Sequence, residues 1–399
     1  MLSYMIVGLC LLMAMFSVEA TDNPASLCDE NTTTAALDWI VAQQHPTTGF
    51  VYSFDAPDSE TWATDKSYSY DQAVAAIALL LNSPAGAANS VGASDYFDTA
   101  ETLLTAMSGG LYRDGVTGYM SVPKTWDTSD GSVSSSSLRS DNIALVGYAF
   151  ALHWLFTGKQ DYAAEAEGIS KWLYSRLKDA GGATDGRCVQ GSDSATYCTT
   201  EHNVASFFTF HLVSYLVNAT EPELSANLTS AAADVALALQ TPLWLVDRFN
   251  MGLSDASRSL LAQTWGTLFL MGGGMDDLTE AAVRAAGALT YTEEKFRTTQ
   301  VVVASGETAD GYGSDADSSN SYHSDSVWSE GSLTVALAYF RGVSTTGSAN
   351  FTQVLSRLQP VFNATSGGVL EGAAYSVVNA DGSDIYPYAA VGGTGELLY

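Results

Sequence analysis

Apolar, helix-length segments recur along the chain, and this repeat constrains the fold more than any single motif. Each segment follows a Gly/Ser/Asp-rich approach and a polar residue. A helix that is apolar on every side must be buried. The repeat therefore predicts buried helices over residues 71–81, 141–156, 201–217, 261–271, 330–340 and from about Val391 onward. Their reference positions Asp71, Asp141, Glu201, Trp265, Glu330 and Gly395 lie 70, 60, 64, 65 and 65 residues apart.

A second set of segments alternates with the first and is amphipathic. In residues 162–178, for example, Ile169, Trp172, Leu173 and Leu177 form one apolar stripe, which is typical of a helix that packs on one side only. The other members of the set are residues 33–44, 96–107, 221–240, 278–296 and 350–361.

Alternating solvent-facing and buried helices predict an all-α fold, an (α/α)6 toroid of six helical hairpins. An open solenoid would also show a repeat, but it would not require the second helix of each pair to be buried on every side. We therefore favour the closed ring, formed by residues 21–399 as one domain. The sixth buried helix has only begun at Tyr399, which we interpret as an incomplete sequence or an imperfect last hairpin.

The N-terminus has the features of a secretory signal peptide, which we assign to residues 1–20. An apolar stretch over residues 5–16 is followed by small residues and then by a polar segment, and the stretch is too short to span a bilayer comfortably. Five Asn-x-Ser/Thr sequons agree with export through a glycosylating pathway. We therefore expect a secreted, extracellular, soluble glycoprotein. The sequons are Asn31, Asn218, Asn227, Asn350 and Asn363, in segments that we expect to be loops or helix ends.

Charge and cysteine content narrow the choice of partners. With 44 acidic and 16 basic residues the net charge is −28, which argues against nucleic acid and membrane partners and makes a polyanionic glycan a poorer substrate than a neutral one. Cys188 and Cys198 flank a Gly/Ser/Asp loop, so we favour a disulfide between them over free thiols, with Cys28 left single. This cysteine spacing does not fit a zinc site.

Several predicted buried helices begin with a carboxylate. Acidic residues are ordinary in a first helical turn, where they suit the helix dipole and the unpaired N–H groups, so capping is one interpretation. The other is a shared sugar site, because aromatic side chains lie beside these acids and can stack on sugar rings. The acids are Asp71, Asp141, Glu201 and Glu330, and the candidate sugar-binding residues are Tyr68, Tyr70, His202, Trp265 and Trp328.

Two carboxyl groups can hydrolyse a glycosidic bond if one is protonated and the other ionised. Glu201 and Glu330 are candidates for the acid, and Asp71 and Asp141 for the base or for gripping sugar hydroxyls, although these roles could be exchanged. His202 could instead be the base of a 2-epimerase or lyase, or simply a hydrogen-bonded helix residue.

Other polar residues receive structural or neutral interpretations. His153 and His211 lie inside apolar segments and are expected to be structural, whereas His323 has no assigned role. The segment 309–328 carries Asp310, Asp315, Asp317 and Asp325, which could form a calcium site, but the order of EF-hand ligands is absent. We favour a solvated loop and predict neither a metal nor a cofactor.

The starts of the predicted buried helices resemble those of the six-hairpin glycosidase-like proteins. The similar segments are 68–73, Asp141-Asn142, 200–203 and 328–331, and the resemblance runs from about Thr33 to Tyr399. It implies a cleft lined by Asp71, Asp141, Glu201 and Glu330, in a group that includes glycoside hydrolases, polysaccharide lyases and sugar 2-epimerases. Fold similarity alone does not choose among these reactions.

The resulting main hypothesis is a secreted, monomeric glycoside hydrolase that acts on a neutral oligo- or polysaccharide through paired carboxylates, with inversion. An epimerase or lyase that uses His202 is the first alternative. A non-catalytic glycan-binding protein is the second.

Overall fold

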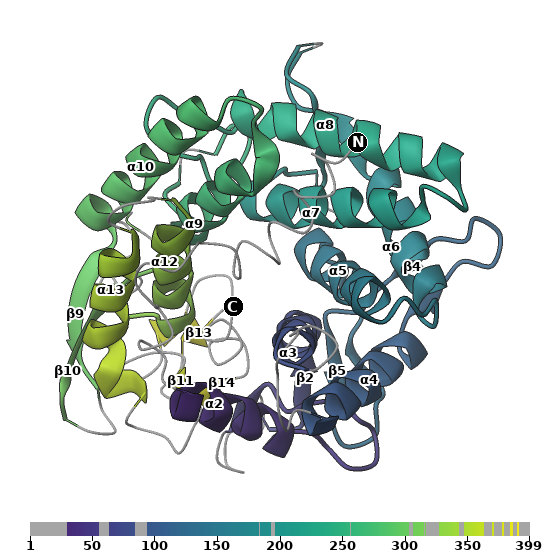
Figure 1. The fold of residues 1–399 in the computed structure, drawn as a ribbon, viewed down its shortest axis with the longest axis horizontal. Coiled ribbons are helices and arrows are strands. Elements are labelled where there is room, and N and C mark those ends of the chain that lie inside the picture. The colour runs from purple at the N-terminus through teal and green to yellow at the C-terminus, as the bar shows by residue number, and fades with distance from the viewer. Residues whose placement is uncertain are drawn as a thin grey trace. The chain divides into compact units, whose positions relative to one another are not determined.

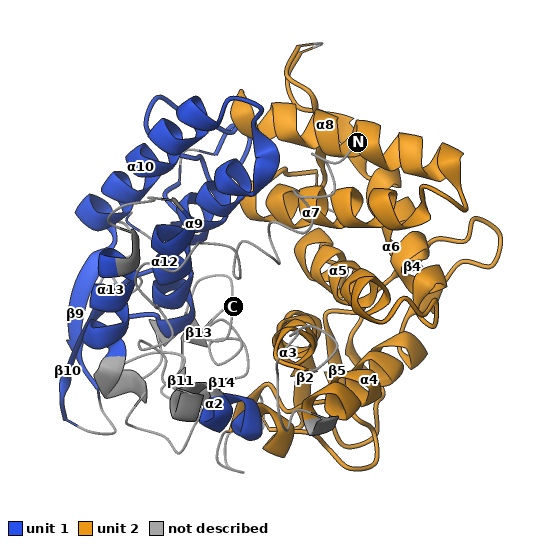
Figure 2. Cartoon of the chain, viewed as in Figure 1, with its two compact units in different colours: residues 1–39, 243–399 blue, residues 40–242 orange. Residues whose placement is uncertain are grey.

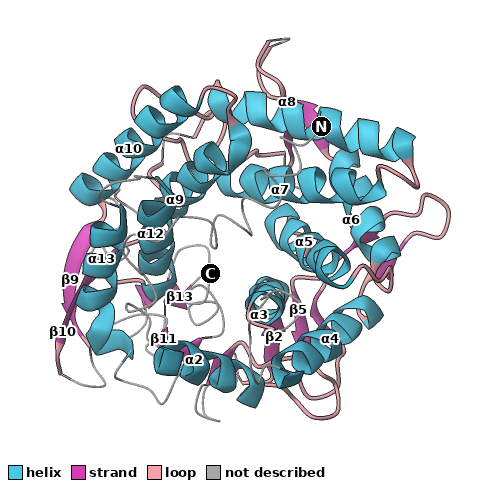
Figure 3. Ribbon diagram, viewed as in Figure 1, coloured by secondary structure: helices cyan, strands magenta, loops and turns pink. Residues whose placement is uncertain are grey.

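The computed structural model describes residues 30–55, 64–83, 94–182, 184–192, 196–255, 257–302, 306–314, 316, 327–342 and 347–362, and four short strands between residues 369 and 390. Within these residues helices dominate, and the strands are only two to five residues long (Figure 3). The all-α class predicted from the sequence is therefore confirmed. Several predicted features lie outside the described residues: the signal peptide, Cys28, Asp315, Asp317, His323, Asp325, Asn363 and the helix from Val391.

The chain forms two compact units (Figure 2). Unit 2 comprises residues 40–242, and unit 1 comprises residues 1–39 and 243–399. The helix α2 (Glu30–Ala42) contributes residues to both.

Unit 2 contains three of the predicted buried helices, α3 (Ser69–Leu81), α5 (Ser140–Thr157) and α7 (Thr200–Val217). Helix α3 packs against α5, and α5 packs against α7, so the three lie side by side (Figure 1). From Ala73 to Leu80 every side chain of α3 is at most 1% exposed, as an apolar surface on all sides requires. The amphipathic helices α4 (Ser94–Gly109), α6 (Ala163–Ser175) and α8 (Pro222–Gln240) each pack against the buried helix that precedes them.

Unit 1 repeats this alternation. The buried helices α9 (Leu260–Phe269) and α12 (Ser329–Gly342) pack against each other. They are covered by α10 (Leu278–Lys295) and α13 (Gly347–Phe362). A hydrophobic core of this unit joins the four helices, and it includes Leu260, Leu289, Phe296, Leu333 and Leu358.

Short antiparallel hairpins connect an outer helix to the next buried helix. They pair β3 (Tyr112–Arg113) with β4 (Met120–Ser121), β7 (Leu177–Asp179) with β8 (Arg187–Val189), and β9 (Arg297–Val301) with β10 (Thr308–Tyr312). Isolated bridges Gln44–Val51 and Trp244–Phe249 occupy the equivalent places after α2 and α8. The remaining strands are β1 (Phe54–Asp55), β2 (Lys66–Tyr68), β5 (Thr125–Asp127), β6 (Val133–Ser135), β11 (Val369–Leu370), β12 (Val377–Val378), β13 (Asp384–Ile385) and β14 (Ala389–Ala390).

A buried side chain at the fourth residue of a buried helix holds the end of the preceding hairpin. In α7, Asn203 Oδ1 accepts a hydrogen bond from Val189 N (2.7 Å), and Asn203 Nδ2 donates to Val189 O (3.3 Å). Gln72 makes the same pair of bonds with the backbone of Val51, and Gln263 makes it with Phe249. We call Gln72, Asn203 and Gln263 the amide clamps.

The other two buried helices vary this arrangement. In α12 the fourth residue is Ser332, whose hydroxyl accepts from Tyr312 N (2.9 Å). In α5 it is Ile143, whose side chain has no polar group. Here the strands β5 and β6 are inserted before the helix, and β5 pairs with both β2 and β6.

Three sequence predictions are wrong in detail. The helix expected over 162–178 ends at Ser175, because the chain then enters strand β7. The helix expected over 261–271 changes to a π-helical turn at Leu270–Gly274, where Gly273 has a φ of 93° that favours glycine. Asp310 lies in strand β10 and pairs with Arg297 (2.7 Å), so it is not part of a solvated loop.

One sequon also differs from the expected loop or helix-end position. Asn227 lies inside α8, whereas Asn350 lies in the first turn of α13, at a helix end as expected. None of the described helices is long and apolar enough to cross a membrane.

Candidate active site at the starts of the buried helices

The first turns of α3, α5 and α7 are directly linked to one another. Asn142 Nδ2 of α5 donates to Ser69 Oγ of α3 (3.1 Å), and Ser140 Oγ of α5 is 2.8 Å from His202 Nδ1 of α7. Each of these turns carries one carboxylate that is partly exposed, although the rest of the helix is largely buried: Asp71, Asp141 and Glu201. Unit 2 thus brings three of the four predicted acids to adjoining helix ends.

Asp141 is held by two cationic or potentially cationic neighbours. Its Oδ2 lies 2.9 Å from Arg139 Nη2 and 3.3 Å from His202 Nε2, and its Oδ1 accepts from Arg139 Nε (3.3 Å). The side chain of Asp141 is 14% exposed and that of Arg139 is 41% exposed. The carboxylate of Asp141 thus binds side chains of Arg139 and His202, and capping of the helix is not its only role.

These contacts determine the charge of Asp141. Burial on its own would raise the pKa of the carboxyl, but the charges and hydrogen bonds of His202 and Arg139 together outweigh it and hold the pKa well below its usual range. The charge of Asp141 in turn raises the pKa of Arg139. Asp141 is therefore ionised whenever the protein is folded near neutral pH, and it cannot donate a proton as a general acid.

His202 is enclosed between α5 and α7. Its side chain is 2% exposed, and both ring nitrogens face partners, with Ser140 at Nδ1 and the Asp141 carboxylate at Nε2. At Nε2 the Asp141 carboxylate (3.3 Å) accepts from a protonated nitrogen, whereas Arg139 Nη2 (3.4 Å) donates to a bare one, so Nε2 has a partner in either tautomer. These contacts favour a role in positioning Asp141 over direct proton transfer with a substrate.

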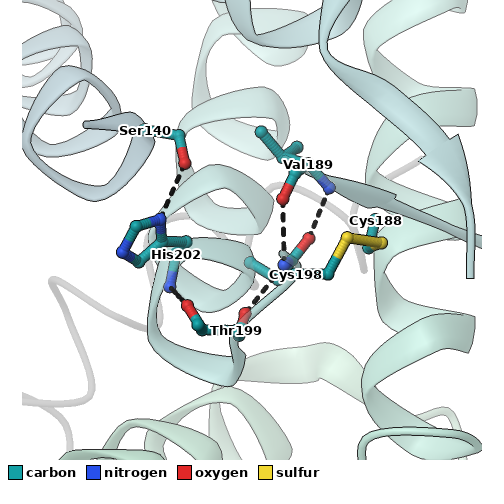
Figure 4. The surroundings of a disulfide bond; sticks show 7 residues. Ser140, Cys188, Val189, Cys198, Thr199 and His202 are labelled. Atoms are coloured by element: carbon teal, nitrogen blue, oxygen red, sulfur yellow. Dashed lines mark hydrogen bonds between the residues drawn. A yellow bond between two sulfur atoms is a disulfide. The ribbon is translucent and has the colours of Figure 1, made fainter. Parts of the chain in front are cut away.

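A disulfide fixes the approach to α7. Cys188 of β8 bonds to Cys198, which is followed by the cap residue Thr199 (Figure 4). The pairing predicted from the sequence is thus confirmed. Thr199 Oγ1 accepts a hydrogen bond from His202 N (3.4 Å). The disulfide is therefore connected to His202 through the cap residue Thr199.

Tyr197 lies next to this disulfide and is 47% exposed. Its ring meets that of His202 edge to face, with centroids 5.8 Å apart and an interplanar angle of 68°. The charges of Asp141 and Glu201 act on its phenol, whose pKa is raised mainly by burial.

The two predicted tyrosines lie at the start of α3. Tyr68 ends strand β2, meets the ring of Phe54 edge to face at 6.2 Å, and has Lys124 Nζ 6.0 Å above its ring. Tyr70 is the second residue of the helix, and both tyrosines are half-buried. They therefore adjoin Asp71 in sequence and the helix ends of unit 2 in space.

The remaining predicted residues belong to unit 1. Glu330 lies half-buried in the first turn of α12, and the half-buried Trp328 packs against the hydrophobic core of the unit. Trp265 is half-buried in the second turn of α9, a helix whose first turn carries no acid. Trp328 thus has a packing role whether or not it also contacts sugar.

The two other described helix histidines are structural, as predicted. His153 is fully buried, and its Nε2 lies 3.1 Å from Glu101 Oε1. His211 stacks on Phe207, and burial lowers its pKa. Within the described residues there is no group of three or more His, Cys, Asp or Glu side chains arranged to hold a metal ion.

Sequence reasoning missed three residues of this cluster. Arg139 and Ser140 stand directly before Asp141, and Tyr197 stands directly before a cysteine that was already assigned to a disulfide. Proximity to a predicted site residue was the available signal. The contacts themselves join residues 139–141 to residues 197–202, which only the folded structure brings together.

Comparisons with known proteins bear on the fold. No family model and no curated protein matches the sequence. The structure is similar to that of a glycosidase, in a glutamate-to-alanine variant in complex with glucose, with a TM-score of 0.64, 11% identity and coverage of 95% of this chain and 96% of that chain. A cellobiose 2-epimerase from Spirochaeta thermophila DSM 6192 gives a TM-score of 0.65 at 12% identity, covering 94% of both chains.

A family 76 glycoside hydrolase from a bovine Bacteroides thetaiotaomicron strain gives a TM-score of 0.63 at 10% identity, covering 92% of this chain and 75% of that chain. These similarities confirm the predicted (α/α)6 toroid fold class. At such low identity they do not define its reaction.

Proposed function

We propose that this protein is a secreted glycoside hydrolase that acts on a neutral oligo- or polysaccharide. The observation that carries the proposal is the row of partly exposed carboxylates at the linked first turns of α3, α5 and α7, beside Tyr68, Tyr70 and Tyr197. Carboxyl groups next to aromatic side chains can both bind a sugar and act on its glycosidic bond. The glycosidases with the same fold support this assignment.

The contacts of Asp141 limit which carboxyl group can be the general acid. Since Asp141 is held ionised by Arg139 and His202, the general acid must be another carboxyl group, and Glu201 is our candidate within unit 2. In the proposed reaction Glu201 protonates the leaving oxygen, while Asp71 activates a water molecule on the opposite face of the sugar. This arrangement inverts the anomeric configuration.

The epimerase or lyase hypothesis has less support. It requires His202 to exchange a proton with the substrate, yet His202 is buried and both of its nitrogens are engaged by Ser140 and Asp141. The cellobiose 2-epimerase with the same fold keeps this hypothesis testable, but no contact in the described site favours it.

Export and substrate charge are parts of the same proposal. The disulfide between Cys188 and Cys198 supports an oxidising compartment. A net charge of −28 supports a neutral rather than an anionic glycan.

The test is incubation of the full-length protein with glucans, mannans, xylans and uronate polymers, following reducing ends and ultraviolet absorbance together. We expect new reducing ends without absorbance, and NMR should show that the first product has the inverted anomeric configuration. Glu201→Gln and Asp71→Asn should each lower kcat by about 10²- to 10⁴-fold, the usual contribution of a general acid or base.

Glu223→Gln, at an exposed glutamate of α8, is the matched control and should leave kcat unchanged. Full activity in the combined Glu201→Gln, Asp71→Asn variant would exclude the carboxylate mechanism. Ultraviolet-absorbing products would indicate a lyase. Sugar-dependent stabilisation without any product would indicate a glycan-binding protein.

A further inference from the structure

Tyr197 is a partly exposed aromatic residue at the candidate site. It stands outside any helix or strand, and it is 47% exposed. Single exposed aromatic residues are ordinary on protein surfaces, so the feature that sets Tyr197 apart is the contact of its ring with His202, the partner of Asp141.

The ring is held in place from several sides. Tyr197 O accepts a hydrogen bond from Gly191 N (2.8 Å), and the next residue, Cys198, is tied to β8 by the disulfide. The ring lies directly over Gly191, where a Cβ atom would overlap with the ring carbons. His202 meets it edge to face. The side chain is therefore fixed before any ligand binds.

Fixed aromatic rings are suited to sugars. A pyranose ring presents C–H groups on one face, which pack on an aromatic surface, while its hydroxyls bind to neighbouring charged groups. Tyr197 contacts the ring of His202, which directly follows Glu201 in the sequence and whose Nε2 lies 3.3 Å from Asp141. A ring fixed in advance loses little conformational freedom on binding.

We propose that Tyr197 is the platform on which a neutral sugar ring stacks next to Glu201, and that the Cys188–Cys198 disulfide and Gly191 fix the platform in place. The proposal rests on the proposed function and adds a specificity-determining residue to it. Tyr197 binds the substrate, whereas Cys188, Cys198 and Gly191 act through Tyr197 and are positioning residues.

The experiment measures binding separately from turnover. The affinity of the sugar that the wild-type protein hydrolyses is measured by calorimetry in the Glu201→Gln background, which holds substrate without consuming it. Tyr197→Ala should weaken binding about five- to tenfold, which corresponds to the upper range of an aromatic pair, and Tyr197→Phe should retain most of the affinity. Tyr215→Ala removes an equally exposed tyrosine, 49% exposed near the other end of α7, and should have no effect.

The positioning residues give an independent test. Gly191→Ala displaces the ring without removing it and should weaken binding to a similar extent. The paired variant Cys188→Ala, Cys198→Ala should also weaken binding, and adding Tyr197→Ala to it should cause little further loss, because the two changes act on the same contact. Circular dichroism and the melting temperature separate these effects from unfolding.

The outcomes distinguish this proposal from the proposed function. If Tyr197→Ala binds sugar as tightly as the Glu201→Gln parent, the platform is excluded and the hydrolase stands. If loss of binding in Gly191→Ala is matched by loss in Tyr215→Ala, the effect is general destabilisation and the platform is again excluded. If the wild-type protein neither binds nor hydrolyses any sugar of the panel, both proposals fall.

Discussion

The neighbours of Asp141 separate it from the other acidic residues of the first turns. Its two oxygens face Arg139 and His202 from α5 and α7, so the carboxylate joins two helices as an anion. Such a group suits orientation of the site, or acceptance of a hydrogen bond from a sugar hydroxyl. Proton transfer needs a pKa near the working pH, which these contacts prevent.

The charge of Asp141 predicts a dependence of stability on pH. Its pKa in the folded protein lies below the value of about 3.9 expected in an unfolded chain, so the folded state binds fewer protons. The stabilisation is fully present above the unfolded pKa, and it is lost as the pH falls toward the folded pKa. Asp141→Asn should lower the free energy of unfolding at pH 7 by about 1–3 kcal/mol, discounted from a fully buried pair because Arg139 is partly exposed.

Urea denaturation of both proteins at pH 7 and pH 3 checks this expectation. The difference in unfolding free energy between wild type and Asp141→Asn should be smaller at pH 3. Asp161→Asn, at an exposed aspartate just before α6, provides the control. A difference of equal size at both pH values would show that Asp141 does not stabilise the fold through its charge.

At the scale of the elements, the three amide clamps join α3, α7 and α9 to the strand or bridge residue that precedes each helix. Gln263 uses its side-chain amide to pair both backbone groups of Phe249, which is 1% exposed. Without the clamp these groups would be buried without partners, which is costly. The clamps thus fix where the buried helix starts, and with it the position of the first turn.

Replacing a clamp should therefore destabilise the unit that contains it. Gln263→Ala should lower the free energy of unfolding by about 2–4 kcal/mol, from two unpaired backbone groups and a small cavity. Gln353→Ala, at an exposed glutamine of α13 in the same unit, should change it by less than about 0.5 kcal/mol. Equal effects of the two substitutions in urea denaturation would show that the clamp contributes nothing beyond helix propensity.

Whether a feature of the fold could be predicted from the sequence depends on how far apart its interacting residues lie along the chain. The helices were predictable because most residues of α3, α5 and α7 are buried, which leaves recurring apolar segments in the sequence. The hairpins were missed because strands of two to five residues are too short to show alternation. The clamps could have been found, since Gln72, Asn203 and Gln263 occupy the same place in the repeat.

The site was predictable only in part for the same reason. The acids Asp71, Asp141 and Glu201 are marked by their position at helix starts, which is local information. The partners of Asp141 are not marked in the sequence, because its contact with His202 joins residues that are 61 positions apart. The role of a carboxylate depends on such partners. The sequence could therefore identify the candidate carboxylates, but it could not distinguish the general acid from a carboxylate that stays ionised.

For the whole molecule, the dominant property is its charge. With a net charge of −28, the protein repels polyanions at long range when the salt concentration is low. The screening length is about 30 Å at 0.01 M ionic strength and falls to about 10 Å at 0.1 M, so added salt removes this repulsion. A neutral glycan is unaffected by either condition.

This difference yields a test of the substrate class that does not depend on any single residue. The ratio kcat/KM should change by less than about twofold between 0.01 M and 0.3 M sodium chloride for a neutral polysaccharide, because no long-range force acts on it. For a polyuronate of similar length, any activity should be low at 0.01 M and should rise with salt as the repulsion is screened. Activity on the polyuronate that falls as salt is added would instead show local attraction by a basic patch, and it would contradict the assignment to neutral glycans.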